Sequence, residues 1–273
     1  MKIVGIQEGA AAATAARRVI LPKIVAVGLV VGAWQAVVLT RWRPQSLLPA
    51  PLSVLSALSH QLVRGDFYQA VAVTMSRAAA GYFLALLIGT AVGASVALVP
   101  VLRQAIGPAI TGLQSMPSVA WFPFALLLFQ FSEAAILFVV ILGAAPSIAN
   151  GIISGIDNVP VQLVAAGRIM GARGLHLYRR VVLPAAMPYV LGGLKQAWAF
   201  AWRSLLAGEL LVVVAGRPSL GVQLQVARNS KNAAALLALL VVLLVIGIVV
   251  DFAFSRVDRG IRRRRGLLTR SRT

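Results

Sequence analysis

The chain has 273 residues, of which 59% are hydrophobic and only 12% are charged. A soluble domain of this length needs more charge to cover its surface, so the composition excludes an ordinary water-soluble protein. The chain contains no cysteine, which excludes disulfides and thiolate metal sites, and its two histidines, His60 and His176, lie too far apart in sequence to suggest a metal site.

Long runs without charged residues predict an all-α membrane protein, a polytopic bundle of about six transmembrane helices. A helix rises ~1.5 Å per residue, so such runs can cross a hydrocarbon core of ~30 Å, and backbone groups in lipid must pair within the helix. The predicted spans are residues 24–40, 78–99, 106–130, 134–155, 190–214 and 232–252. The fifth is interrupted by Lys195, Arg203 and Glu209, which we expect to face the bundle interior, a cavity or a helix end.

Basic residues indicate how these spans are oriented. Most of the 26 Lys and Arg lie in residues 1–23, at Arg103, in residues 157–187 and after residue 254. The positive-inside rule places these segments in the cytoplasm. We therefore expect a cytoplasmic tail at 1–23, a transmembrane domain at 24–254 and a basic cytoplasmic tail at 255–273. The arginines of that last tail are expected to touch anionic lipid headgroups and not nucleic acid, and the N-terminus does not have the pattern of a cleaved signal.

Two short patterns predict packing features. Residues 51–64 carry leucines along one helical stripe but are too short to cross the core, so they predict an amphipathic helix on the outer surface. In the second predicted span small residues recur every four positions, at Gly81, Ala85, Gly89 and Gly93. Such a ridge permits close helix contact, either inside one subunit, which we favour, or across a dimer.

The third predicted span is interrupted by two prolines. Proline removes a backbone donor and kinks a helix, and the freed carbonyls are best tolerated beside a water-filled cavity. A broken helix lining a pathway and a simple packing kink both fit this pattern. The candidate pathway residues are Gln114, Ser115, Met116, Pro117, Ser118 and Pro123.

The segment between the fourth and fifth spans predicts a helical hairpin. Asn158 is a plausible N-cap, and Pro160 suits the first turn. Gly171 and Gly174 permit a sharp bend before a second short helix, which Pro184 and Pro188 should limit. A docking element for a soluble partner explains such a hairpin better than the stability of the membrane domain does.

This segment resembles the EAA loop of binding-protein-dependent ABC transporter permeases. That motif consists of Glu-Ala-Ala, three residues, glycine, nine residues and then Ile-x-Leu-Pro. The spacing is kept here, but Ala165 stands in place of the glutamate and Gly167 in place of the second alanine. The residues that resemble the ATPase-coupling loop, at 157–187, are Ala165, Ala166, Gly167, Arg168, Gly171, Ala172, Arg173, Gly174, Leu183 and Pro184.

The resemblance covers roughly residues 45–258 and is closest to the nitrate/sulfonate/taurine subgroup. The motifs similar to that subgroup are Leu48-Pro49-Ala50-Pro51, Ser76-Arg77 with Gly81, the run from Met116 to Pro123, Trp202 with Ala207-Gly208-Glu209-Leu210, and Ser219-Leu220-Gly221.

The resemblance implies a permease subunit of an ATP-driven importer in a bacterial plasma membrane. Two permease copies would pair, two cytoplasmic ATPase subunits would bind ATP and magnesium, and an extracytoplasmic binding protein would deliver the solute. The subgroup implies a small anion, an aliphatic sulfonate such as taurine before nitrate or bicarbonate. Arg168 and Arg173 would pair with acidic groups on the ATPase or lie at lipid headgroups, and both readings stay open.

Arg203 and Glu209 are the other candidates for the pathway. They are separated by about 600° of helical rotation and should not share one face. A cation in the pathway would suit an anionic substrate, but we favour structural roles for both residues.

The sequence carries no catalytic pattern. It has no G-x-x-x-x-G-K-[ST] phosphate loop, and no paired carboxylates, nucleophile–base set or metal cluster emerges from it. We therefore expect neither a catalytic site nor a bound cofactor in this chain. The alternative is a secondary transporter or channel that works without an ATPase, and such a protein should show internal repeats, none of which is clear here.

Overall fold

The computed structural model describes residues 21–22 and 24–264, and all regular secondary structure in this part of the chain is helical. The predicted all-α class is therefore confirmed. In chain order the elements are a helix at Ile24–Leu39, α2 (Pro51–Val63), α3 (Gly65–Leu98), α4 (Pro100–Ser115), the 3₁₀ turn η1 (Ser118–Trp121), α5 (Phe122–Phe129), α6 (Glu133–Asp157), α7 (Val161–Ile169), α8 (Gly174–Leu177), the π-helical turn η2 (Tyr178–Val182), α9 (Leu183–Leu211), α10 (Leu220–Asn229) and α11 (Ala233–Arg264).

The chain divides into two compact units. The first contains the described residues up to Val63 together with residues 227–239, and the second contains residues 64–226 and the chain from residue 240. Helix α2 belongs to the first unit and has 13 residues, of which only Val54 is buried. The short helix predicted at 51–64 is therefore confirmed, and it is too short to cross a membrane.

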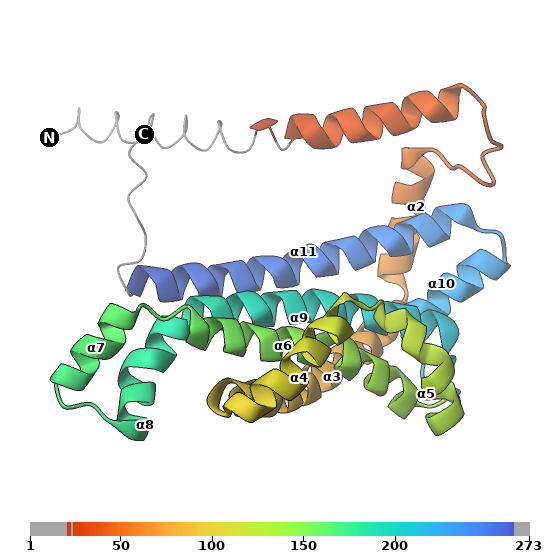
Figure 1. Cartoon of the computed structure of the whole chain (residues 1–273). Coiled ribbons are helices and arrows are strands. Elements are labelled where there is room, and N and C mark those ends of the chain that lie inside the picture. The colour runs from red at the N-terminus through yellow and green to blue at the C-terminus, as the bar shows by residue number, and fades with distance from the viewer. Residues whose placement is uncertain (1–20, 23, 265–273) are drawn as a thin grey trace, which may run out of the picture. The chain divides into compact units, whose positions relative to one another are not determined.

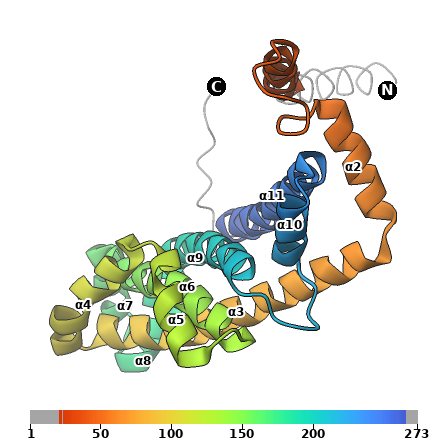
Figure 2. The same ribbon diagram turned by 90° about the vertical axis from the view of Figure 1, so that its right-hand side faces the viewer.

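The second unit is organised around α6. Figure 1 shows α6 and α9 running side by side, with α7 and α8 projecting beyond one end and α5 lying at the other. Figure 2 also shows α9 beside α6, and α3 packs on α6 as well. Helix α6 is accordingly the most deeply buried of the long apolar helices. Residues at one end of α6 therefore meet α3 and α9 together.

Close backbone contacts hold these three helices together. A Cβ on Gly89 of α3 would lie 2.6 Å from the carbonyl oxygen of Ala145 in α6. Gly151 of α6 and Gly193 of α9 face each other, and a Cβ on Gly193 would lie 2.7 Å from the Cα of Gly151. The glycine and alanine ridge of α3 is buried against α6 within one chain, which confirms the predicted packing role.

The third predicted span is broken. Helix α4 ends at Ser115, and the segment Ser118–Phe129 leaves it at an angle of 101°. Pro117 lies at the break, where its missing N–H costs no helical hydrogen bond. The predicted interruption is confirmed, whereas a single straight helix over 106–130 is not observed.

The predicted count of six spans is not confirmed. Among the described residues three helices are long and apolar enough to cross a membrane, and the bent pair of α4 with the segment Ser118–Phe129 makes four if it counts as one. The helix Ile24–Leu39 is shorter than the other three. Helix α9 has 29 residues but carries Lys195, Arg203 and Glu209, which lower its hydropathy.

Helix α3 begins at Gly65, thirteen residues before the start predicted for the second span. The sequence interpretation used Arg77 as a boundary because an unpaired charge is costly in an apolar helix. Arg77 instead lies inside α3 and is only 4% exposed, because carboxylates from two other helices surround it. A paired arginine does not end a helix.

Candidate functional site

The segment between α6 and α9 forms the predicted helical hairpin. Helix α7 ends in a Schellman arrangement, in which Ala172 N–H donates to the Gly167 carbonyl at 2.9 Å and Gly171 N–H donates to the Arg168 carbonyl at 3.0 Å. Gly171 has φ +87° and Gly174 has φ +52°, values that L-residues with side chains rarely adopt. The predicted bend at these two glycines is confirmed.

Gly167 explains one departure from the loop motif. It is buried, and a Cβ there would lie 2.9 Å from Leu177 Cδ1 and 3.0 Å from Val181 Cγ2. The glycine thus lets α7 approach the second arm of the hairpin closely. The two arms share a small core in which Leu177 and Val182 are buried with Ala186.

Two details of the hairpin prediction are wrong. Asn158 does not cap α7, because its Nδ2 donates to the Ser154 carbonyl at 2.8 Å and so closes the end of α6. Pro184 and Pro188 do not end the second helix, which continues through η2 into α9. A π-helical turn widens the helix just before Pro184, which moves away the carbonyl that its ring would otherwise meet.

The outer surface of the hairpin is apolar and exposed. Ile169 and Met170 at the end of α7 are 87% and 86% exposed, and Leu175 at the start of α8 is 83% exposed. Of the predicted loop residues, Gly167 is buried, and Ala172 and Pro184 are partly buried. The exposed ones are Ala165, Ala166, Arg168, Gly171, Arg173, Gly174 and Leu183. Most of the motif therefore lies where another protein could contact it.

The base of the hairpin is tied to the start of α4. Arg103, in the first turn of α4, forms an ion pair with Asp157 at the end of α6. The distribution of basic residues predicts that Arg103 and the 157–187 segment lie on one side of the membrane. The contact shows that they lie at the same end of the bundle.

Polar side chains join the broken helix to its neighbours. Gln114 near the end of α4 accepts a hydrogen bond from Asn150 of α6. Ser118 in η1 lies 2.6 Å, oxygen to oxygen, from Ser204 of α9. Neither Asn150 nor Ser204 was identified from the sequence, although each is a polar residue within an apolar helix. The structure thus brings two of the predicted pathway residues onto α6 and α9.

The other predicted pathway residues near the break make no such link. Ser115 Oγ donates to the Gly112 carbonyl of its own helix at 2.8 Å. Met116, Pro117 and Pro123 are exposed on the surface of the described chain. These residues lie on the surface near the bend and do not form a polar cluster with one another.

A buried charge network lies at the end of α9 that is remote from the hairpin. Arg77 Nη1 donates to Glu209 Oε1 at 2.9 Å, while its Nε and Nη2 donate to the two oxygens of Glu133 at 2.7 and 2.6 Å. Glu209 is fully buried. A buried carboxylate is costly unless it is paired and hydrogen-bonded, and here one guanidinium serves two carboxylates.

The network extends into the chain that follows α9. Thr74 Oγ1 lies 2.9 Å from Glu209 Oε2 and accepts from the Leu220 N–H at 3.0 Å. The Gly221 N–H donates to Glu209 Oε2 at 3.1 Å. A Cβ on Gly221 would lie 2.3 Å from Glu209 Cβ, so only glycine allows this approach. The carboxylate of Glu209 therefore joins α3, α9 and the start of α10.

Three of the motifs noted in the sequence meet in this network. They are Ser76-Arg77, Ala207-Gly208-Glu209-Leu210 and Ser219-Leu220-Gly221, each of which supplies one of its contacts. The sequence indicates Glu209 as a candidate but gives no sign of its connection with Arg77 or Glu133. Since these residues lie on different helices, no local spacing could show the connection. The buried contacts of Glu209 are those that its favoured structural role expects.

Arg203 lies apart from this network. Its Nε donates to the Ala199 carbonyl of the same helix at 3.0 Å, and its guanidinium lies 4.8 Å from the centre of the Phe200 ring. The side chain of Arg203 is exposed on the surface of the described chain. Arg203 and Glu209 thus point in different directions, as their spacing predicted. A partner for Arg203 within the bundle is not observed among the described residues.

No metal centre is found in the part of the chain that the structure describes. No three residues among its His, Asp and Glu side chains lie close enough to hold a metal ion. The charged clusters that do form pair carboxylates with guanidinium or ammonium groups.

Long apolar helices with a projecting helical hairpin are typical of a membrane-embedded subunit with a docking element. The chain belongs to the family described as "Binding-protein-dependent transport system inner membrane component", whose model matches residues 81–263. It is thus a permease subunit of the ABC transporter type. The matched region includes the hairpin, Glu133 and Glu209, whereas Thr74 and Arg77 lie just before it.

Named relatives support this membership. Nitrate import permease protein NrtB of Leptolyngbya laminosa is 32% identical over 198 residues, which cover 71% of this chain and 70% of that protein. Bicarbonate transport system permease protein CmpB of Synechocystis sp. is 28% identical over 151 residues, covering 55% of this chain and 54% of that protein. Both are transport permeases.

Solved structures share the fold. An inward-facing structure of the MetNI methionine ABC transporter matches with a TM-score of 0.61 and 22% identity, covering 72% of this chain and 96% of that one. An amino acid ABC transporter matches with a TM-score of 0.56 and 19% identity, covering 76% of this chain and 97% of that one. At these identities the likeness describes the fold alone.

Proposed function

We propose that this chain forms the transmembrane pathway of an ATP-driven importer for a small oxyanion. The observation that carries the proposal is the 32% identity with a nitrate import permease over about seven tenths of both chains. The bicarbonate permease relative points to the same class of solute. Both named solutes are small, planar oxyanions.

Three anions are candidates for the solute. Nitrate and bicarbonate are supported by the names of the relatives, whereas an aliphatic sulfonate such as taurine is supported by the sequence motifs described above. Arg203, an exposed guanidinium on α9 without a carboxylate partner among the described residues, is a candidate contact for such an anion.

The hairpin of α7 and α8 is the proposed contact for the ATPase subunit. Its exposed apolar residues suit a groove on a soluble partner, and Arg168 and Arg173 could pair with acidic groups at the rim of that groove. The Schellman turn and the small core shared by the two arms make the hairpin a rigid lever. Movement of the ATPase would then reach α6 and α9 directly, because the hairpin joins these two helices.

The remaining parts of the proposed assembly follow from the family. We propose that two copies of this chain pair in a bacterial plasma membrane, with both termini and the hairpin in the cytoplasm. An extracytoplasmic binding protein would deliver the solute to the opposite face. ATP and magnesium would bind to the ATPase subunits and not to this chain.

Reconstitution tests the proposal directly. The permease would be inserted into liposomes with the ATPase and the binding protein identified by co-purification from its source organism, and uptake of isotopically labelled nitrate, bicarbonate and taurine would be compared. The proposal expects ATP-dependent uptake of one of these anions that requires the binding protein. Uptake at the same rate without ATP or without the ATPase would instead support a secondary transporter or channel.

A further inference from the structure

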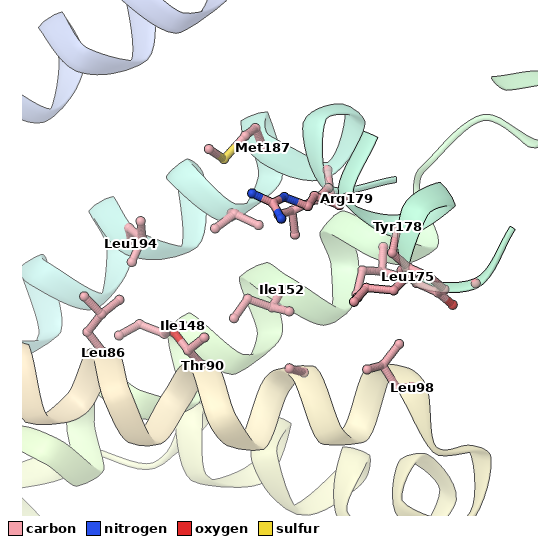
Figure 3. Close-up of a pocket in the computed structure, with 16 residues that line it drawn as sticks. Leu86, Thr90, Leu98, Ile148, Ile152, Leu175, Tyr178, Arg179, Met187 and Leu194 are labelled. Atoms are coloured by element: carbon pink, nitrogen blue, oxygen red, sulfur yellow. The ribbon is translucent and has the colours of Figure 1, made fainter. Parts of the chain in front are cut away.

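A large apolar cavity lies on the side of the second unit, next to the hairpin. It has a volume of about 920 Å³ and is lined by α3, α6, the start of α8, η2 and α9. Figure 3 shows Leu86 and Leu194 at one end and Leu98, Leu175 and Tyr178 at the other. Apart from Thr90, the hydroxyl of Tyr178 and the guanidinium of Arg179, its lining side chains are apolar.

The cavity has the length of one leaflet of a bilayer. Leu86 and Leu98 lie twelve residues apart on α3, which corresponds to about 18 Å along the helix. Half of a hydrocarbon core is about 15 Å. The end near Leu98 adjoins the hairpin, where the polar interface of the membrane begins in the proposed orientation. The cavity would therefore run from the headgroup region towards the middle of the bilayer.

Arg179 supplies a positive charge at the hairpin end of this cavity. Figure 3 shows its guanidinium pointing in among the apolar side chains that line the cavity. No described residue forms a hydrogen bond or an ion pair with it. Arg179 is exposed in the described chain, so its guanidinium is accessible to an anion from outside. A guanidinium matches phosphate geometry well.

A second copy of the chain offers no carboxylate for this role among its described residues. Asp66 pairs with Arg64, Glu133 and Glu209 pair with Arg77, Asp157 pairs with Arg103, and Asp251 pairs with Lys195. The remaining described acid, Asp258, is also engaged. These pairings leave no free carboxylate for Arg179 among the described residues, which favours an anion from outside this part of the chain over a second copy as the occupant.

We propose that this cavity binds an anionic phospholipid, with an acyl chain along α3, α6 and α9 and the headgroup phosphate at Arg179. The proposal goes beyond transport of the solute and rests on the membrane location alone. The side of the membrane follows from the proposed orientation, but the headgroup preference does not depend on it. A lipid bound here would contact η2, the connection between the hairpin and α9.

Native mass spectrometry of the full-length chain in a non-ionic detergent tests this. The probe is an equal mixture of phosphatidylglycerol and phosphatidylcholine with the same acyl chains. We expect the wild type to retain phosphatidylglycerol preferentially, and Arg179→Ala to weaken that retention by about fivefold, the usual value of one basic side chain near an anionic lipid. Arg180→Ala is the matched control, since Arg180 is the next residue and does not line the cavity.

Three further variants complete the test. Arg179→Lys should retain most of the binding, which separates loss of charge from loss of folding. Ala94→Phe fills the cavity and should reduce retention of both lipids, whereas Leu87→Phe, on an exposed position of the same helix outside the cavity, should not. Equal retention by the wild type and Arg179→Ala, or equal losses at Arg179 and Arg180, would overturn the proposal.

The competing occupant can be tested in the same preparation. Because the chain has no cysteine, Thr90→Cys introduces a single thiol at the cavity. We expect no cross-link between two copies at this position with a short thiol-specific cross-linker. Efficient cross-linking that phosphatidylglycerol does not prevent would identify the cavity as a contact between copies and would overturn the proposal.

Discussion

The guanidinium of Arg77 lies 2.9 Å from the carboxylate of Glu209, although 132 residues separate the two in the chain. Both are buried, and Glu133 completes the arrangement from the first turn of α6. The network therefore joins α3, α6 and α9 at the end of the bundle that is remote from the hairpin. In the proposed mechanism the hairpin end of these helices moves, and this network holds the helices together at the other end.

Removing Arg77 should destabilise the permease strongly. Arg77→Ala leaves Glu209 buried without its cation, and the loss of one partner of a buried pair costs about 3–5 kcal/mol. Thermal unfolding of the purified protein in detergent measures the change. Arg64→Ala is the control, because Arg64 pairs with Asp66 at an exposed site and should change stability little. Equal shifts for the two variants would contradict the structural role of the network.

The contact between α6 and α9 should distinguish two adjacent glycines. Gly193→Ala places a Cβ 2.7 Å from the Cα of Gly151, so the helices must move apart, at a cost of about 1–3 kcal/mol. Gly192→Ala meets nothing within 4 Å and should be neutral or stabilising, because alanine favours helix by about 1 kcal/mol. The unfolding temperatures of both variants check this prediction. A larger decrease for Gly192→Ala than for Gly193→Ala would contradict the close contact between α6 and α9.

The turn of the hairpin should be sensitive at Gly171. Its φ of +87° costs an L-residue about 1–2 kcal/mol, so Gly171→Val should distort the turn without touching the membrane core. We expect this variant to lose co-purification with the ATPase subunit while it still inserts in the membrane. Gly107→Val in α4 is the control, because nothing lies within 4 Å of its Cβ position. Retention of the complex by Gly171→Val would argue against docking at the hairpin.

Arg203 should affect transport and not stability. Its side chain is exposed, and it contacts only a carbonyl of its own helix and the ring of Phe200. Arg203→Ala should therefore leave the unfolding temperature nearly unchanged. We expect the same variant to lower anion uptake in liposomes, because the pathway loses a cation. Arg203→Lys should recover part of the uptake. Wild-type rates in Arg203→Ala would remove this residue from the pathway.

The hairpin was the part of the site most accessible from sequence. The spacing of Gly171 and Gly174 predicts a bend, since glycine readily adopts a positive φ. The continuation through Pro184 and Pro188 was missed, because the π-helical turn that accommodates it has no clear residue signature. Local rules thus predicted the turn but not the junction with α9.

Long-range pairing explains the other differences. A lone charge in an apolar helix predicts the edge of a span at Arg77, because nothing near it in sequence indicates its two carboxylate partners. Likewise Asn150 and Ser204 acquire meaning only when α6 and α9 bring them to Gln114 and Ser118. Hydropathy predicted the presence of the helices, whereas the contacts between them depend on tertiary structure.

The most direct test of the account is to locate the hairpin and its partner together. Met170→Cys places the chain's single thiol on the exposed tip, and Leu127→Cys, 82% exposed on α5, is the control. We predict that a membrane-impermeant maleimide does not label Met170→Cys in intact cells. Once the membrane has been opened, we predict that the same variant cross-links to the ATPase subunit. Labelling of Met170→Cys in intact cells would contradict the account. Cross-linking to the ATPase by Leu127→Cys but not by Met170→Cys would contradict it as well.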